Sequence, residues 1–395
     1  MYSHLKTFAL AYLLLLCGCA QDTPTDHPAS LQPNFEAQVI DSDVQIGYGL
    51  AIGHVDDDGK PDILLADKKQ YVWYQNGSWE RHVIQEDLTA RDNVAIAARD
   101  IDGDGLVEIA VGAMWNPGET SDKSQSGSVH YLVRPDDPKN LWEAVQLHHE
   151  PTTHRMRWVQ AGENNYDLIV LPLHGVGNQG GEGDGVKVIA YSKPADPHDT
   201  WSMQTVDDQM HMTHNFDFRE TNQGTELFIA GKEGIRRIHH DGQWATSATK
   251  IDALTHGAGE VRVGHLGDTP LVATIEPLHG TSLVAYIGDQ EKQRVVLDTT
   301  FAQGHALAVA DVLKLGRDQV IAGWRNPNQE EKVGIKLFIP DESGQSWTSF
   351  VIDDNSMACE DLRVADLNDD GLLDIIAAGR ATNNLIIYWN KSGQH

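Results

Sequence analysis

The sequence predicts an all-β fold, a seven-bladed β-propeller closed by pairing the N-terminal strand with the last blade. Three observations predict it. An outer-strand motif recurs seven times at a spacing of about fifty residues, and a motif of two strands around an acidic turn recurs beside it. The strands at the two chain ends are also complementary, because the chain starts with an outer strand and its last repeat ends at the third strand, without an outer one.

The outer-strand motif is an aromatic or apolar residue followed by alternating residues that end in an apolar pair. Such alternation is typical of a strand with one buried face. Good copies occupy residues 35–41, 79–85, 142–148, 201–207 and 347–353, and weaker copies begin at Trp244 and Gln293. One outer strand per repeat is what a propeller blade requires.

The second motif is a strand, an acidic turn and another strand. Its best copies are residues 54–67, 100–112 and 366–379, and degenerate copies end in residues 168–173, 227–231, 271–275 and 320–323. A third strand follows in most repeats, so that each repeat supplies four short strands with turns between them.

The chain ends predict how the ring closes. The chain begins with an outer strand at residues 35–41 and ends with a third strand at residues 385–389. The first segment therefore completes the last blade, which leaves no free sheet edge between the ends. We expect a single propeller domain over residues 35–395.

The first residues have the pattern of a targeting segment. Lys6 is followed by an apolar stretch, residues 8–16, that is too short to span a bilayer. The tetrapeptide Leu16–Cys19 resembles a bacterial lipobox, which implies a signal peptide over residues 1–18, lipidation of Cys19 and a polar tether over residues 19–34. The expected location is the bacterial cell envelope, either periplasmic or surface-exposed. The alternative is an ordinary secretory signal with an incidental cysteine.

Composition excludes several classes of protein. The chain has 30 Lys and Arg against 58 Asp and Glu, a net charge of −28. An electronegative surface repels phosphate backbones and anionic headgroups, so we expect no nucleic-acid partner and membrane contact only through the lipid anchor. The 40% hydrophobic content argues against a disordered chain. Cys359 is the one cysteine in the predicted propeller domain, so the sequence offers no structural disulfide there.

The acidic turns place oxygen ligands at alternate positions with a later carboxylate, a pattern that suits a hard cation. They resemble FG-GAP or VCBS repeats, the calcium-loop blades of integrin-like propellers, which implies structural calcium. Two turns fit the pattern well, with ligand sets Asp100, Asp102, Asp104, Glu108 and Asp366, Asn368, Asp370, Asp374. In the first repeat His54 replaces the leading acid and leaves Asp56, Asp58 and Asp62. The alternative is a solvated acidic turn without an ion.

The loops that precede the first strand and follow the second strand of each blade share one face of the disc. Seven of the 19 histidines fall in these loops, all in the third to sixth blades: His154, His174, His211, His214, His256, His279 and His305. Trp, Arg and Asn accompany them, so we interpret this rim as the functional face. For any one of these histidines, the alternative is a loop residue bonded to backbone.

Two chemistries use such a cluster. Neutral imidazoles can hold zinc or another divalent cation that polarises a substrate oxygen, or a histidine can act as general base while a cation neutralises a carboxylate. Both suit β-elimination. The candidate metal ligands are His214, His279, His305 and Glu360. The candidate catalytic residues are His154, His174, His214, Arg155, Arg157 and Tyr48. The candidate substrate-binding residues are Trp115, Asn116, Lys232, Trp324, Arg325 and Arg380.

This layout resembles the seven-bladed propeller polysaccharide lyases and the propeller domain of aldos-2-ulose dehydratase. In the lyases, one His enters the inner strand of a blade and a second leaves the next strand about twenty residues later, as His154 and His174 do here, which implies a role as base or carboxylate partner. His214 stands where the lyases place a Tyr acid, which favours metal-assisted elimination on a keto-sugar, as in the dehydratase. We therefore expect a carbon–oxygen lyase with a carbohydrate substrate; the alternative is a non-catalytic propeller that binds glycan or protein.

Overall fold

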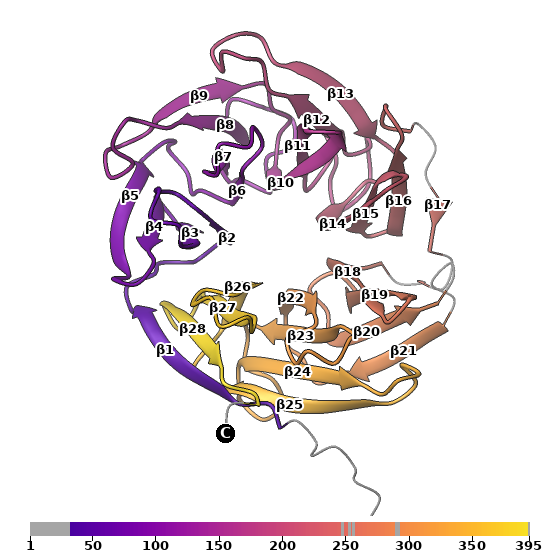
Figure 1. The fold of residues 1–395 in the computed structure, drawn as a ribbon. Coiled ribbons are helices and arrows are strands. Elements are labelled where there is room, and N and C mark those ends of the chain that lie inside the picture. The colour runs from indigo at the N-terminus through magenta and orange to yellow at the C-terminus, as the bar shows by residue number, and fades with distance from the viewer. Residues whose placement is uncertain (1–31, 246–248, 252–253, 255–256, 289–292, 394–395) are drawn as a thin grey trace, which may run out of the picture.

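A computed structural model describes residues 32–245, 249–251, 254, 257–288 and 293–393. The leader, residues 1–18, the lipidation site Cys19, most of the tether and His256 lie outside the described residues. The described chain forms a ring of seven four-stranded antiparallel sheets, with one strand of each sheet lining a central channel (Figure 1). The predicted seven-bladed propeller is confirmed.

Each blade runs outward from an inner strand. The strands of blades 1 to 3 are β2 (Gly49–Gly53), β3 (Asp62–Ala66), β4 (Gln70–Gln75), β5 (Glu80–Glu86), β6 (Ala95–Arg99), β7 (Glu108–Ala113), β8 (Ser128–Val133), β9 (Glu143–Leu147), β10 (Thr153–Gly162), β11 (Asn165–Pro172), β12 (Val188–Ser192) and β13 (Ser202–Asp207). Those of blades 4 to 7 are β14 (Thr213–Thr221), β15 (Gly224–Gly231), β16 (Gly234–His240), β17 (Thr249–Lys250), β18 (Glu260–Leu266), β19 (Thr269–Glu276), β20 (Ser282–Ile287), β21 (Gln293–Asp298), β22 (Gly304–Ala310), β23 (Gln319–Trp324), β24 (Gly334–Pro340), β25 (Trp347–Asp354), β26 (Cys359–Ala365), β27 (Asp374–Gly379) and β28 (Asn384–Asn390).

The ring closes as predicted. The outer strand of blade 7 is β1 (Phe35–Asp41), which pairs antiparallel with β28 from Phe35 opposite Asn390 to Asp41 opposite Leu385. Just outside this pairing, the Lys391 amide donates to the carbonyl of Asn34. The first described strand therefore covers the edge that β28 would otherwise leave exposed.

Blade 4 departs from the predicted outer-strand pattern. Trp244 was expected to begin an outer strand, but its ring is buried and its indole N–H donates to Asp167 of blade 3 at 2.9 Å. The outer strand is instead the two-residue β17. Trp142 and Trp201 are buried in the same way, but there the outer strand begins at the next residue, so blade 4 differs in its strand and not in the burial of its tryptophan.

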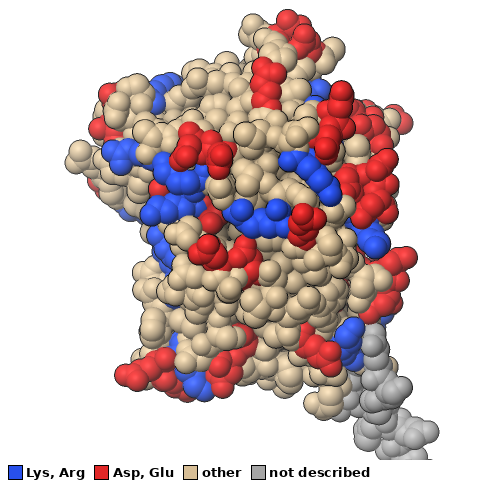
Figure 2. Space-filling view, turned by 90° about the vertical axis from the view of Figure 1, so that its left-hand side faces the viewer, with Lys and Arg blue, Asp and Glu red and all other residues tan. Residues whose placement is uncertain are grey.

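The hydrophobic core lies between neighbouring sheets. Apolar side chains of the two middle strands of each blade are buried against those of the next blade, as Ile109 and Val111 of blade 2 are against Leu64 of blade 1. In the part of the chain described, no helix is long and apolar enough to span a membrane. The side of the ring in Figure 2 carries acidic and basic side chains intermixed, with no continuous basic area.

Candidate functional site

Four inner strands carry the same irregularity at their second residue. In β10, β14, β22 and β26, the register with the next strand skips one residue, as in a β-bulge. The skipped residues are His154, His214, His305 and Glu360, and all four are buried. A bulge re-aims a side chain that regular alternation would place elsewhere. The bulges thus deliver three imidazoles and a carboxylate to one mouth of the channel.

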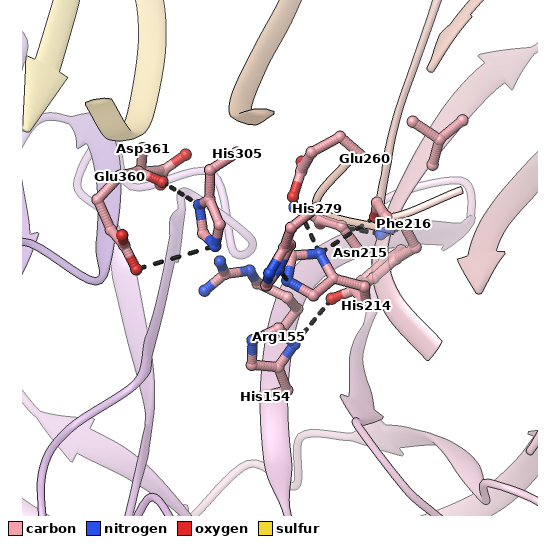
Figure 3. Close-up of polar contacts among 12 residues, drawn as sticks. His154, Arg155, His214, Asn215, Phe216, Glu260, His279, His305, Glu360 and Asp361 are labelled. Atoms are coloured by element: carbon pink, nitrogen blue, oxygen red, sulfur yellow. Dashed lines mark hydrogen bonds and ion pairs between the residues drawn. The ribbon is translucent and has the colours of Figure 1, made fainter. Parts of the chain in front are cut away.

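The imidazoles form one group, which we call the His cluster: His154, His214, His279 and His305. His279 comes from the loop after β19 rather than from a bulge. Ring centroids lie 4.6 Å apart for His154 and His214, 4.1 Å for His214 and His279, 5.3 Å for His214 and His305, and 4.7 Å for His279 and His305 (Figure 3). His214 is therefore the central ring.

Hydrogen bonds to Nδ1 fix the tautomers of three rings. His154 Nδ1 contacts the carbonyl of His214 at 2.8 Å, and His305 Nδ1 contacts the carbonyl of Glu360 at 2.5 Å. His214 Nδ1 lies 3.2 Å from the carbonyl of Gly259 and 3.1 Å from a carboxylate oxygen of Glu260. Carbonyls and carboxylates only accept, so each Nδ1 carries the proton and each Nε2 keeps its lone pair.

His279 has the opposite tautomer. Arg325 donates to His279 Nδ1 at 3.3 Å, and an arginine cannot accept in return. The neutral ring therefore carries its proton on Nε2, which faces His214 Nε2 and donates to it. A continuous chain of donors runs from Arg325 through two imidazoles to the Glu260 carboxylate.

Burial favours the neutral form of His154, His279 and His305. Burial, together with neighbouring histidines and Arg155, lowers the pKa of His154 and of His305 well below its usual range, and Arg325 contributes at His305. Burial, then His214 and Arg325, lowers the pKa of His279 to about 2. Neutral rings are the form that binds metals and accepts protons.

Glu360 is held by two arginines at the rim. Arg325 Nη1 lies 2.9 Å from one of its oxygens, and Arg380 Nη1 lies 3.0 Å from the other. His305 Nε2 is 3.8 Å from the same carboxylate. Arg155 crosses the mouth and donates to the carbonyls of Tyr48 and Val94 at 3.2 and 3.3 Å. The cluster therefore has fixed positive charge beside its imidazoles.

Three rings could hold a metal ion. One ligand atom from each of His214, His279 and His305 lies within 4.8 Å of the other two. The Glu260 carboxylate behind His214 is the kind of outer partner that orients a ligating imidazole. Two of the three rings already have the tautomer that ligation through Nε2 requires, and His279 reaches it once Arg325 releases Nδ1. The donor set suits zinc or another borderline cation.

Two further predicted residues lie at this mouth. Trp115, on the loop after β7, stacks on His154 with ring centroids 4.9 Å apart. Tyr48 donates its hydroxyl to Asp92 at 3.2 Å, and the Arg380 guanidinium lies 5.5 Å over its ring. Burial, followed by the Asp92 charge, raises the pKa of Tyr48, so the phenol stays protonated.

Other predicted residues are placed elsewhere among the described residues. The His174 ring makes none of the ring contacts above, and its buried Nδ1 has no hydrogen-bond partner. Lys232 bonds to Glu182 and the carbonyls of Gly180 and Gly181, where it ties down the long blade 3 loop.

Three more predicted residues lie outside the His cluster. Asn116 bonds within its own loop, to the carbonyl of Gln125. Trp324 is buried and stacks on Phe301 at 5.1 Å. Arg157 lies further along the channel, where it donates to the carbonyl of Phe216.

Sequence reasoning missed Glu260 and Gln303. Glu260 begins β18 with regular pairing to Ile275, and no motif distinguishes it from other strand-end acids. Its position gave a signal, however, because it aligns with His154 and His214 at the start of their inner strands. Gln303 accepts from Arg325 at 3.0 Å and holds that guanidinium against Glu360.

The acidic turns differ from one another. Asp100, Asp102 and Glu108 each direct a carboxylate oxygen to within 4.8 Å of the other two. Burial, then the charges of Asp102 and Asp104, raises the pKa of Glu108 to about 7. In the last blade, both oxygens of Asp374 accept backbone N–H groups, from Leu367 and Asn390. Of the two predicted calcium loops, the blade 2 loop has the more compact carboxylate cluster.

Two family models match parts of the chain. The family model for the aldos-2-ulose dehydratase beta-propeller domain matches residues 126–289, and that for the FG-GAP-like repeat matches residues 54–111. The predicted resemblances to FG-GAP repeats and to the dehydratase propeller are confirmed, and the resemblance to the polysaccharide lyases stays a prediction. The first match includes His154, His174, His214 and His279. No curated protein matches the chain in sequence.

Solved structures share the fold. A chain in a crystal structure of the mitotic checkpoint complex aligns with a TM-score of 0.57 at 12% identity, over 97% of this chain and 99% of that chain. The crystal structure of BBS1N in complex with ARL6DN, soaked with lead, aligns with a TM-score of 0.55 at 12% identity, over 90% and 95%. At these identities the likeness shows the propeller fold alone.

Proposed function

We propose that this chain is a carbon–oxygen lyase or dehydratase that performs β-elimination on a uronate- or keto-sugar at the His cluster. One observation carries the proposal: three imidazoles with convergent ligand atoms lie beside fixed guanidinium groups, and two of the three, His214 and His279, fall within the residues that match the dehydratase propeller. β-Elimination needs a base at the carbon next to a carbonyl or carboxylate, and positive charge at the oxygen that becomes anionic.

His214, His279 and His305 would hold a divalent cation, with Glu260 orienting His214. When bound, such a cation acts as a Lewis acid on the substrate oxygen. Glu360 is already shared by Arg325 and Arg380, so it shapes the guanidinium positions and is a less available ligand than the imidazoles.

His154 is the favoured base. Its Nδ1 is fixed on the His214 carbonyl, so Nε2 is the lone pair that can accept the α proton. The electron pair of the broken C–H bond forms the double bond, and the C–O bond on the next carbon breaks. The leaving oxygen takes a proton from the Tyr48 hydroxyl, which burial keeps protonated, or from water. Arg155 and Arg380 stabilise the negative charge that develops.

The test combines metal analysis with a substrate screen. We expect purified protein to carry close to one equivalent of zinc or a similar metal, and to convert a uronate glycan or an oxidised sugar into a conjugated product seen by ultraviolet absorbance. His279→Ala should lose both properties. The matched control is His198→Ala, which removes an exposed histidine on the outside of the ring.

The alternative function, a non-catalytic propeller that binds glycan or protein, gives different results. In that case no substrate yields an unsaturated product, and glycan binding survives His154→Ala and His214→Ala. Metal without turnover would also favour it.

We also propose that the chain is lipid-anchored at Cys19 in a bacterial envelope. Cells that express the full chain and are fed labelled palmitate should label it, and Cys19→Ser should release it in soluble form. Unlabelled wild-type protein would favour an ordinary secretory signal.

A further inference from the structure

The central channel contains a cavity below the His cluster, with a volume of about 280 Å³. Inner strands of blades 1, 2, 3, 4 and 7 form its wall, and its charged lining side chains are Arg99, Arg157 and Arg363. No carboxylate lines it, although the chain has a net charge of −28. We call it the channel cavity.

The channel cavity is distinct from the His cluster. Arg157 follows His154 by three residues on β10, which separates them by about 10 Å at 3.3 Å per residue. The lining residues Arg99, Phe218 and Val364 lie toward the last residues of their inner strands, nearer the acidic turns. A ligand there would approach from the face opposite the imidazoles.

Two of the three guanidinium groups have carboxylate partners. Arg99 forms a two-point ion pair with Glu220, at 2.7 and 3.1 Å, and Arg363 lies 2.6 Å from Asp361. Arg157 differs. Among the residues described, no carboxylate lies within ion-pair distance of it, and its one hydrogen bond runs from Nε to the carbonyl of Phe216 at 3.1 Å.

Charges of both signs lie near Arg157, but none of the described carboxylates forms an ion pair with it. Arg262, on β18, also faces this part of the channel and has a buried nitrogen without a hydrogen-bond partner. Burial, then the charges of Arg262 and Arg363, lowers the pKa of Arg157 to about 9, while Asp217 and Asp361 oppose that shift. The side chain is still charged at neutral pH. The guanidinium is only partly buried and lies 5.7 Å over the Phe216 ring, so its remaining N–H donors can meet a ligand in the channel cavity.

We propose that the channel cavity binds a small oxyanion, a carboxylate or a phosphate, through the two free Nη atoms of Arg157, with the outer edges of Arg99 and Arg363 completing the site. A guanidinium fork matches two oxygens of such an ion. The volume exceeds the roughly 150 Å³ of a cavity that holds a benzene-sized molecule, so a dicarboxylate also fits. This site is independent of the proposed elimination chemistry.

The experiment measures thermal stability of the full mature chain at fixed ionic strength, with chloride replaced stepwise by inorganic phosphate or by malonate. A ligand that binds only the folded state stabilises it by RT ln(1 + [L]/Kd), so the melting temperature rises with ligand concentration. We expect one of the two anions to raise it well beyond chloride, and the larger rise identifies the class. Direct titration calorimetry should give a matching dissociation constant.

Arg157→Met should abolish the anion-dependent rise, because the guanidinium that binds the anion is gone. Arg157→Lys keeps the charge without the fork and should weaken binding about tenfold, which guards against misfolding of the Met variant. Arg81→Met, on an outer strand, is the matched control and should behave as wild type.

Two results would overturn the proposal. One is a wild-type chain that neither anion stabilises more than chloride does. The other is binding that survives Arg157→Met but disappears in His279→Ala, which would place the anion at the His cluster.

Discussion

Removal of Arg325 should tighten metal binding at the His cluster, although it deletes a residue of the site. Arg325 donates to His279 Nδ1, and that bond keeps the ring proton on Nε2. Ligation through Nε2 needs the proton on Nδ1, where it would point at the guanidinium. A metal ion and the Arg325 contact therefore compete for one tautomer of His279.

The magnitude follows from the bond that has to break. A hydrogen bond to a charged group contributes about 1.5–3 kcal/mol, and water and Gln303 replace part of it at this partly open rim. A net gain of about 1.4 kcal/mol for Arg325→Met corresponds to tenfold tighter binding. Loss of the nearby positive charge acts in the same direction, and Glu360 keeps Arg380 as a partner.

The assay is a zinc titration against a chromophoric chelator near neutral pH. Lys332→Gln is the matched control, because this substitution also removes one positive charge from the same loop. Lys332 pairs with exposed Asp354 and is not part of the His cluster. We expect at least a tenfold lower dissociation constant for Arg325→Met and little change for Lys332→Gln. Weaker binding in Arg325→Met would refute the competition and show that Arg325 orients His279 for ligation.

Three further predictions test other parts of the structure. Glu260→Gln should weaken metal binding 10- to 100-fold in the same titration, because His214 loses the carboxylate that orients it; unchanged affinity would exclude that role. In metal-free protein, the pKa of His279 is so low that below about pH 6.5 only the unfolded state takes up a proton on this ring. The free energy of unfolding therefore decreases as the pH is lowered, and His279→Gln should reduce that slope by up to about 1.4 kcal/mol per pH unit in urea unfolding. An equal slope in the variant would contradict this. Calcium should raise the melting temperature more at pH 8 than at pH 6, because Glu108, with a pKa raised to about 7, must lose its proton to bind; Asp102→Asn should remove the effect, and a rise that is independent of pH would count against this site.

The sequence predicted the blade count and the closure because both depend on strand periodicity. Repeats with good alternation lie where expected, and the pairing of β1 with β28 follows from which strand type stands at each chain end. Trp244 shows the limit. The predicted copy that begins at Trp244 contains the outer strand of blade 4, but that strand is only the two-residue β17, and the indole N–H bonds to Asp167 of the neighbouring blade, a contact that no local pattern reports.

Histidine positions in the loops indicated the right face, but not how the rings meet. Their spacing of twenty residues suggests a shared role for His154 and His174, but only His154 stacks in the cluster, from its bulge. His279 reaches the cluster from the loop after β19, whereas His174, on the corresponding loop after β11, makes none of these ring contacts. Periodicity places alternate residues on alternate faces and carries no information about a skipped residue. The partners of Nδ1, which set each tautomer, depend on distances between blades.

The distribution of bulges explains why a near-symmetric ring has an asymmetric site. Blades 3, 4, 6 and 7 carry the bulge, whereas the inner strands of blades 1, 2 and 5 pair in regular register. Each bulge adds one inward side chain at the mouth without altering the strands behind it, so the core between sheets is unaffected. Blade 5 supplies His279 from a loop instead. Four chain positions and one loop thus bring the His cluster and Glu360 together at one mouth of a repetitive ring, while the regular strands of blades 1 and 2 form part of the wall of the channel cavity.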